Sequence, residues 1–158
     1  MARLELGVAA IKGAKAHMPQ APARTVPVPI PLGDADKHFT VVNGLKLVGK
    51  HRIMDFVDCA GVLDDPELME TEMRTAAEAA GATLLFIHLH KFGDGGGVTG
   101  VAILAESHIS VHTWPEIGFA AFDAFMCGQT EPKKAQHVLE KAFRPSNIIV
   151  GELIRGPL

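Results

Sequence analysis

The sequence predicts an α+β fold, a two-layer sandwich in which a mainly antiparallel sheet carries two helices on one face. Two observations support this prediction. The predicted elements run in the order strand, helix, a run of strands, helix, strand. Both predicted helices are apolar on one side only, so that each covers the sheet with that side. The other face of the sheet then needs cover, which a second subunit or the N-terminal part of the chain could supply.

The first 40 residues differ in composition from the rest. They contain little periodicity and several prolines, which favour extended or polyproline-like backbone. We expect an N-terminal arm over residues 1–40, followed by a single domain over residues 41–158. Such an arm either packs across a partner subunit or forms a loosely ordered tail, and composition alone favours the tail. The prolines concerned are Pro19, Pro22, Pro27, Pro29 and Pro31.

A strand is predicted over residues 50–58, and the first helix follows it. Asp65 can accept hydrogen bonds from the free amides at the start of that helix, and Pro66 suits its first position. Gly81 supplies the stop. The apolar face repeats at helical spacing and consists of Met69, Met73, Ala76, Ala77 and Ala80.

The remaining elements alternate between apolar runs and turn residues. A loop at 93–97, nearly all glycine, separates the first two of these runs. The second helix has Ala135, Val138, Leu139 and Ala142 on one face. Strands are predicted over residues 83–92, 98–105, 109–113, 118–125 and 147–154, and the second helix over residues 132–143.

Composition excludes several classes of function. The net charge is −3 and Lys and Arg are scattered, which argues against nucleic-acid binding. The longest apolar runs are too short for a membrane span. Cys59 and Cys127 form no Cys-x-x-Cys pattern, which indicates reduced thiols and a cytoplasmic protein.

Chemically active side chains concentrate between residues 105 and 116, where carboxylates, hydroxyls, imidazoles and the only tryptophan lie close together. Ser107 with His112 as base would suit a hydrolase, but no Gly-x-Ser-x-Gly turn surrounds the serine. A zinc site is a second interpretation, since alternating histidines share a strand face. Its ligands would be His88 and His90, or His108 and His112, together with Cys127.

A third interpretation rests on resemblance. Residues 106–116, Glu-Ser-His-Ile-Ser-Val-His-Thr-Trp-Pro-Glu, are followed by Phe-Ala-Ala-Phe-Asp at 119–123 and Phe-Met-Cys-Gly at 125–128. This pattern resembles bacterial S-adenosylmethionine decarboxylase, a pyruvoyl-dependent enzyme made as a proenzyme. The similarity extends more weakly over residues 44–151 and does not cover the arm. The family commonly forms a homodimer of αβ protomers, and neither a metal nor pyridoxal phosphate is implied.

The resemblance implies autocatalytic cleavage between Glu106 and Ser107. Ser107 would attack the carbonyl of Glu106 to form an ester, and elimination would leave a β chain, 1–106, and an α chain that begins with a pyruvoyl group derived from Ser107. By the same resemblance, His112 is the base that removes the serine α-hydrogen. Thr99 stands where the family has a serine whose hydroxyl assists the rearrangement, and its added methyl makes the side chain stiffer.

One geometric difficulty follows from the spacing. Ser107 and His112 are five residues apart, so a regular strand would place them on opposite faces. We therefore expect a turn or a bulge near Ser107.

For the decarboxylation itself, the resemblance implies a Schiff base between the pyruvoyl carbonyl and the substrate amine, and Cys127 as the general acid. Glu116 would accept hydrogen bonds from the ribose hydroxyls. Phe92 would stack on the adenine, although a core position at a strand end is an alternative for this residue.

The glycine loop departs from the family, which usually has Pro-Tyr-Gly there. Asp94 in this loop could pair with a guanidinium or ammonium group, so two substrate classes stay open. With S-adenosylmethionine the product is the aminopropyl donor for spermidine synthesis. With arginine or ornithine it is agmatine or putrescine. An unprocessed, non-catalytic partner is the remaining alternative.

Overall fold

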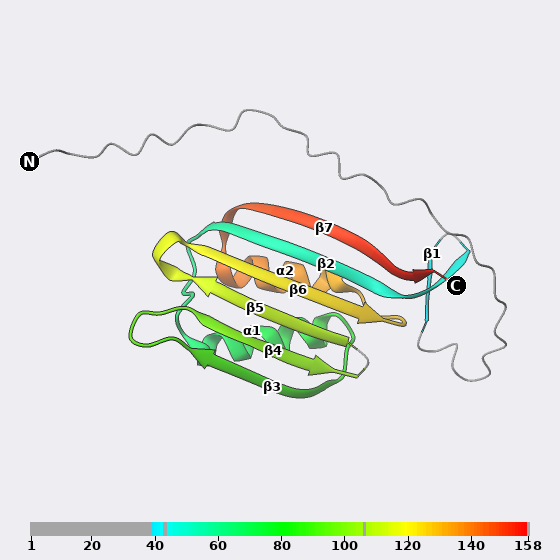
Figure 1. The fold of residues 1–158 in the computed structure, drawn as a ribbon, viewed down its shortest axis with the longest axis horizontal. Coiled ribbons are helices and arrows are strands. Elements are labelled where there is room, and N and C mark those ends of the chain that lie inside the picture. Colours follow the sequence, from blue (N-terminus) through cyan, green and yellow to red (C-terminus); the bar gives the residue numbers. More distant parts are fainter. Residues whose placement is uncertain (1–38, 43, 106, 158) are drawn as a thin grey trace, which may run out of the picture.

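The structure is a computed structural model that describes residues 39–42, 44–105 and 107–157, without the side chains of residues 42, 45 and 157. In this part of the chain, seven strands form one antiparallel sheet, and two helices pack on one face of it (Figure 1). The predicted two-layer sandwich is confirmed. The interpretation of residues 1–40 as an arm falls almost entirely outside the described residues.

The central strands lie in the order β1-β2-β6-β5-β4-β3, and β7 pairs with the other side of β2. A short 3-10 turn at Pro115–Ile117 links β5 to β6. The strands are β1 (Thr40–Val42), β2 (Leu45–Cys59), β3 (Leu84–Lys91), β4 (Val98–Leu104), β5 (Ser107–Trp114), β6 (Phe119–Cys127) and β7 (Pro145–Pro157), and the helices are α1 (Pro66–Ala79) and α2 (Pro132–Phe143).

Several strands are longer than the sequence predicts. β2 begins five residues before its predicted start at residue 50, and β7 ends three residues after its predicted end at residue 154. The reason is their mutual pairing from Leu47 opposite Pro157 to Cys59 opposite Pro145, which holds polar residues in extended backbone. Tertiary pairing overrides local propensity here.

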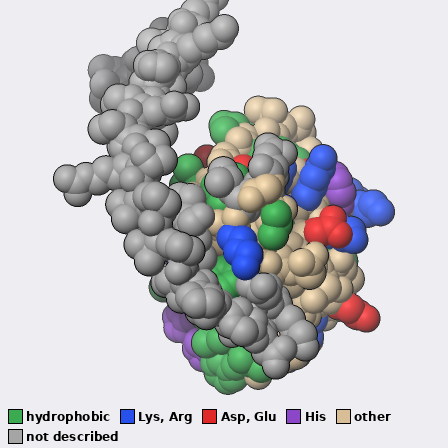
Figure 2. All heavy atoms as spheres, turned by 90° about the vertical axis from the view of Figure 1, so that its right-hand side faces the viewer, with side chains coloured by type: hydrophobic (Ala, Val, Ile, Leu, Met, Phe, Trp, Pro, Cys, Tyr) green, Lys and Arg blue, Asp and Glu red, His purple; other side chains and the backbone are tan. Residues whose placement is uncertain are grey.

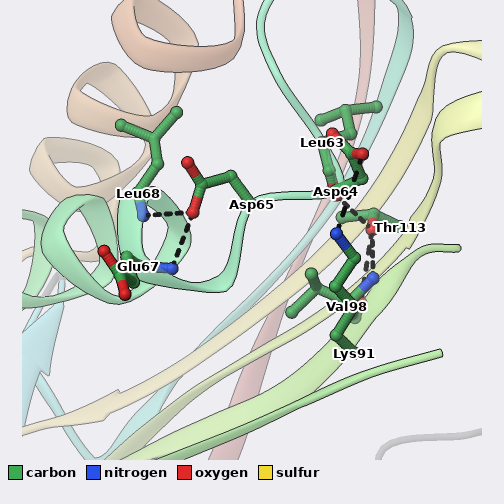
Figure 3. Close-up of polar contacts among 8 residues, drawn as sticks. All are labelled: Leu63, Asp64, Asp65, Glu67, Leu68, Lys91, Val98 and Thr113. Atoms are coloured by element: carbon green, nitrogen blue, oxygen red, sulfur yellow. Dashed lines mark hydrogen bonds and ion pairs between the residues drawn. The ribbon is translucent and has the colours of Figure 1, made fainter. Parts of the chain in front are cut away.

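Helix α1 begins and ends as predicted. The Asp65 carboxylate accepts hydrogen bonds from the amides of Glu67, at 2.9 Å, and Leu68, at 3.2 Å (Figure 3). At the other end Gly81 has a φ of +75°, a conformation that glycine adopts without strain, and its amide donates to the carbonyl of Glu78. This cap lets the chain turn directly into β3.

The core lies between the helices and one face of the sheet. Phe122 of β6 is at its centre, with ring centroids 5.1 Å from Phe56 of β2 and 5.7 Å from Phe143 of α2. Met69 and Met73 of α1 are completely buried, as their helical spacing predicts. Burial alternates strictly along β5 and β6, so each strand has one face in this core and one face turned away from it.

The second face of the sheet, called the open face below, carries no helix in the described chain (Figure 1). It combines polar side chains with large apolar ones that remain exposed. An apolar surface of this kind on a single chain indicates an interaction site. The exposed apolar residues on this face are Ile53, Phe86, Ile103, Trp114, Ile149 and Leu153.

The end of the molecule where β7 finishes shows no concentration of one charge. In Figure 2, basic, acidic and apolar side chains are mixed over the described residues on this side. Neither of the two described helices has the length and apolar character needed to cross a membrane.

Candidate active site

A pocket of about 720 Å³ opens where the glycine loop, β4 and β5 meet. It brings together five residues that the sequence pattern singles out, although they come from three different segments. Antiparallel pairing of β4 with β5 produces this convergence, because the end of β5 then lies beside the start of β4. The five residues are Phe92, Asp94, Thr99, His112 and Glu116.

Thr99 and His112 form the polar centre of this pocket. They are direct partners across β4 and β5, and the Thr99 Oγ1 lies 2.6 Å from His112 Nδ1. A threonine hydroxyl in this position fixes the orientation of the imidazole and leaves its Nε2 available to act on another group. The arrangement is suited to a positioned base.

Thr113 anchors the floor of the pocket, and the sequence pattern did not single it out. Its buried hydroxyl donates to the Leu63 carbonyl at 2.8 Å and accepts from the Val98 amide at 2.7 Å (Figure 3). Nearby, Lys91 lies 3.9 Å from the Asp64 carboxylate. These contacts tie β5, β4 and the segment before α1 together. A threonine between apolar residues of a strand is a common pattern and gave no specific signal.

The glycine loop approaches its neighbours so closely that side chains are excluded. A Cβ on Gly97 would lie 1.9 Å from the Thr113 carbonyl oxygen, and one on Gly96 would lie 1.5 Å from the Phe92 carbonyl oxygen. Gly93 and Gly95 have positive φ values of 57° and 68°. The density of glycine therefore follows from the backbone path that forms one wall of the pocket.

Phe92 and Glu116 both line this pocket. Phe92 is 57% exposed, so the alternative of a core position is wrong. Its ring makes an edge contact with His90 at 4.9 Å between centroids. Glu116 lies in the 3-10 turn after β5 and is exposed, with its carboxylate available as an acceptor.

Ser107 and Cys127 form a second group away from the pocket. Ser107 is the first residue of β5 and is 8% exposed, and its Oγ accepts a hydrogen bond from the Cys127 amide at 3.2 Å. Cys127 is the last residue of β6 and is half-buried. Serine and cysteine therefore lie together at one end of the sheet. Glu106 lies outside the described residues.

The chain turns directly before Ser107, as expected, since Leu104 pairs with Ser107. No bulge follows, because the register runs without a shift to Thr99 opposite His112, so the turn does not bring Ser107 and His112 onto one face. Ser107 accordingly points to the core side and His112 to the open face. Five residues of strand separate them by about 16 Å. A hydrolase pair of these two side chains within one chain is therefore contradicted.

A polar cluster lies on the open face between the two groups. His51 Nε2 is 3.3 Å from Asp123 Oδ1, and the Ser110 hydroxyl donates to the other Asp123 oxygen at 3.4 Å. Burial lowers the pKa of His108, and the neighbouring His51 lowers it further, while Asp123 opposes both effects. Among the described residues no group of three or more His, Cys, Asp and Glu is arranged to hold a metal ion.

Comparisons with known proteins place the chain in a family. Residues 50–156 match the protein family described as S-adenosylmethionine decarboxylase. The chain belongs to the S-adenosylmethionine decarboxylase family. Membership confirms the resemblance predicted from the sequence and the interpretation of the chain as a decarboxylase.

Individual relatives agree with this assignment. An S-adenosylmethionine decarboxylase proenzyme of Synechococcus sp. is 47% identical over 124 residues, which cover 70% of this chain and 96% of the relative. The proenzyme of Methanococcus aeolicus is 44% identical over 116 residues, covering 72% and 98%. A crystal structure of the adenosylmethionine decarboxylase from Aquifex aeolicus superposes with a TM-score of 0.62 at 31% identity, covering 71% of this chain and 93% of that one.

Proposed function

We propose that this member of the S-adenosylmethionine decarboxylase family cleaves itself between Glu106 and Ser107 and then decarboxylates S-adenosylmethionine with a pyruvoyl group derived from Ser107. The observation that carries the proposal is the hydrogen bond from the Cys127 backbone amide to Ser107 Oγ at 3.2 Å, because it supports a common location for the proposed nucleophile and the residue proposed as proton donor. Relatives named as proenzymes support self-processing.

The position of Ser107 fits its role as the precursor of the pyruvoyl group. It is the first residue of β5 and pairs with Leu104, the last residue of β4. In the proposed reaction, Ser107 Oγ bonds to the Glu106 carbonyl carbon as the peptide C–N bond breaks, which gives an ester and a free amine. A base then removes the Ser107 α-hydrogen, and the Cβ–O bond breaks as the Glu106 carboxylate leaves. The remaining enamine takes up water and loses ammonia, which gives the pyruvoyl carbonyl.

The base in this scheme is His112. Because the regular strand separates it from Ser107 of the same chain, we infer that it comes from a second copy of the chain. Two copies with their open faces together would bury the exposed apolar residues between sheets about 10 Å apart. A twofold axis between the faces and perpendicular to the strands places the Ser107 end of one copy over the His112 end of the other. The active enzyme is accordingly a homodimer of αβ protomers with two composite sites.

The remaining functions come from the pocket of one copy and from the Ser107 and Cys127 end of the other copy. The pyruvoyl group accepts the electrons that are released with carbon dioxide. Cys127 holds the proton that is returned to the substrate carbon. Glu116 accepts hydrogen bonds from the ribose hydroxyls, and Phe92 offers an exposed ring for the adenine. Asp94 lies on the same wall and supplies a second carboxylate near a cationic substrate.

S-adenosylmethionine is preferred over arginine or ornithine because the matched family and the relatives named above are described as S-adenosylmethionine decarboxylases. The product is then the aminopropyl donor for polyamine synthesis, and the cytoplasm is the compartment that keeps Cys59 and Cys127 reduced.

Intact mass spectrometry of the purified chain tests the proposal. Two fragments that meet at residues 106 and 107, the second with a blocked N-terminus, are expected. Borohydride reduction in the presence of S-adenosylmethionine should attach the ligand to the second fragment, whereas arginine and ornithine should leave its mass unchanged. An uncut chain that traps no ligand contradicts the proposal and favours a non-catalytic partner. Trapping of arginine or ornithine alone would reassign the substrate.

A further inference from the structure

We propose that β7 pairs with β7 of a second copy of the chain, antiparallel and about a twofold axis at Gly151. Within the described residues, β7 pairs with β2 along one side only, and Figure 1 shows it at the outer margin of the sheet. The other side of its thirteen residues therefore presents a row of amides and carbonyls to no neighbouring strand in this part of the chain. An edge of this length is a template for pairing with another chain.

The edge lacks the features that usually prevent such pairing, which are lysines, interior prolines and bulges. Between its terminal prolines β7 contains neither lysine nor proline, and its register against β2 runs without a shift. On the open face, Ile149 is 58% exposed and Leu153 is 50% exposed. On the face that carries the helices, Val150 is 39% exposed and Ile154 is 49% exposed. Burial of these side chains against a second copy stabilises the association.

A twofold axis perpendicular to the sheet limits the possible registers. Directly opposite residues of an antiparallel pair lie on the same face, and a residue on the axis lies opposite its own copy. With Gly151 on the axis, the whole strand pairs with itself, and Pro145 lies opposite Pro157 of the partner subunit. The prolines, which have no N–H to donate, then lie only at the two ends of the contact.

This register places apolar side chains opposite one another on both faces. On the open face, Ile149 lies opposite Leu153 of the partner subunit. On the other face, Ile148 lies opposite Ile154 of the partner subunit. Each of these pairs occurs twice because of the symmetry. Cross-strand pairs of this kind are the main source of side-chain stabilisation between antiparallel strands.

The neighbouring registers are unfavourable. An axis at residue 152 places the two Glu152 carboxylates directly opposite each other, and like charges in that position are destabilising. An axis at residue 150 places Ile148 opposite Glu152 of the partner subunit. With the axis at Gly151, Glu152 lies opposite an apolar valine and keeps the ion pair with Arg52 of its own chain. The order of apolar and charged residues along β7 therefore favours a single register.

Gly151 offers a position at which the contact can be tested without disturbing the chain itself. Its φ is not in the left-handed region, and a Cβ there would meet only the Ile53 Cβ at 4.0 Å, an ordinary van der Waals contact. A side chain at this position is thus accommodated by its own chain. Across the axis it lies directly opposite the same side chain of the second copy.

The β7 contact does not depend on the pairing of open faces proposed above, but that pairing determines the size of the assembly. The twofold axis between the open faces runs across the strands, so the β7 edges of the two stacked copies lie on the same side of the dimer. A second dimer then pairs with both edges at once. This arrangement closes a tetramer with D2 symmetry, in which no β7 edge is left unpaired.

Sedimentation velocity of the full-length protein tests the contact. The unaltered chain is expected to be a tetramer. Gly151→Lys should halve its mass to that of a dimer, because two ammonium groups then face each other across the axis. Gly151→Glu should do the same for the same reason. An equimolar mixture of these two variants should regain the tetramer, since an ammonium group then lies opposite a carboxylate.

Gly151→Ala is the matched control and should remain a tetramer, because two methyl groups fit opposite each other at a spacing of about 4.5–5.5 Å. Self-cleavage should be equal in all of these proteins, which shows that the variants fold. A series that runs from dimer to monomer instead would support the β7 contact and contradict the pairing of open faces.

Three results would overturn the proposal. The first is a mass that Gly151→Lys leaves unchanged, since the edge then contacts no second copy of itself. The second is a loss of mass in both charged variants that their mixture does not reverse. The third is a mass of the unaltered chain that rises with concentration beyond the tetramer, because β7 would then pair with a different edge of the next copy in an open chain.

Discussion

Thr99 Oγ1 lies 2.6 Å from Nδ1 of His112 across the β4–β5 pair. We propose that this contact gives Thr99 the role that the resemblance assigns to a serine. Because the hydroxyl orients the imidazole, we expect Thr99→Val to slow conversion of the proenzyme by at least about tenfold, since a general base contributes roughly 10²–10⁴-fold when it is held in position. The time course of fragment formation in freshly translated protein measures this. Thr99→Ser, which retains the oxygen, should convert nearly as fast as the unaltered chain, and slow conversion of both variants would contradict the orienting role.

An active site that combines Ser107 of one copy with His112 of the other should allow two inactive chains to restore cleavage when they form a mixed dimer. A chain with Ser107→Ala cannot form the ester, and a chain with His112→Ala lacks the base. If each site combines the two ends of different copies, a mixed dimer contains one complete site, and only the His112→Ala chain is cut. Differently tagged chains that are coexpressed reveal which one is cleaved. Absence of cleavage in mixed dimers whose formation is verified would show that each copy uses its own histidine.

The regular register of β5 also shows where sequence reasoning succeeded and where it failed. Alternation correctly separated Ser107 from His112, and the caps of α1 at Asp65 and Gly81 were correctly located, because these features depend on local backbone geometry. The bulge was inferred only to bring two residues of one chain together. It was unnecessary once the two residues were considered in different subunits, and a single sequence contains no direct record of a subunit interface.

Long-range contacts were the other feature that the sequence could not reveal. Thr113 looks like an ordinary strand residue, yet its hydroxyl joins segments 15 and 50 positions away. The same holds for the contact between Ser107 and Cys127, which depends on the β5–β6 register. The family resemblance identified most of the candidate site residues, although not Thr113. Only the structure shows that they form two groups, one in the pocket and one at Ser107 and Cys127.

The buried hydroxyl of Thr113 should matter for stability. Thr113→Val preserves shape but leaves the Val98 amide and the Leu63 carbonyl without this partner, at a cost of about 1–3 kcal/mol for a buried unsatisfied group. Chemical denaturation measures the difference in the free energy of unfolding. Thr113→Ser retains both hydrogen bonds and loses only a methyl, so it should be clearly milder. Equal losses for the two variants would assign the effect to packing.

The His108 imidazole predicts a dependence of stability on pH. Burial and His51 lower its pKa below the ordinary value of 6.5, so the unfolded chain binds more protons than the folded chain just below that pH. Its contribution is fully favourable above about pH 6.5 and is lost as the pH falls toward the lowered pKa. Denaturation midpoints at pH 8 and pH 5.5 should therefore differ less for His108→Gln than for the unaltered chain. An unchanged difference would assign the pH dependence to other groups.

Substitution of Cys127 should separate self-cleavage of the chain from decarboxylation of the substrate. Its backbone amide donates to Ser107 Oγ, and this contact should persist in Cys127→Ser, whereas the thiol proposed as proton donor is replaced by a much weaker acid. We expect this variant to cut itself normally and to release carbon dioxide from S-adenosylmethionine about 10²–10⁴-fold more slowly. Cys59→Ser provides the matched control, because Cys59 lies at the opposite end of β2 from the residues that pair with Cys127. Full decarboxylation by Cys127→Ser would exclude the thiol as proton donor, and loss of self-cleavage in the same variant would instead indicate that the side chain is required to form the site.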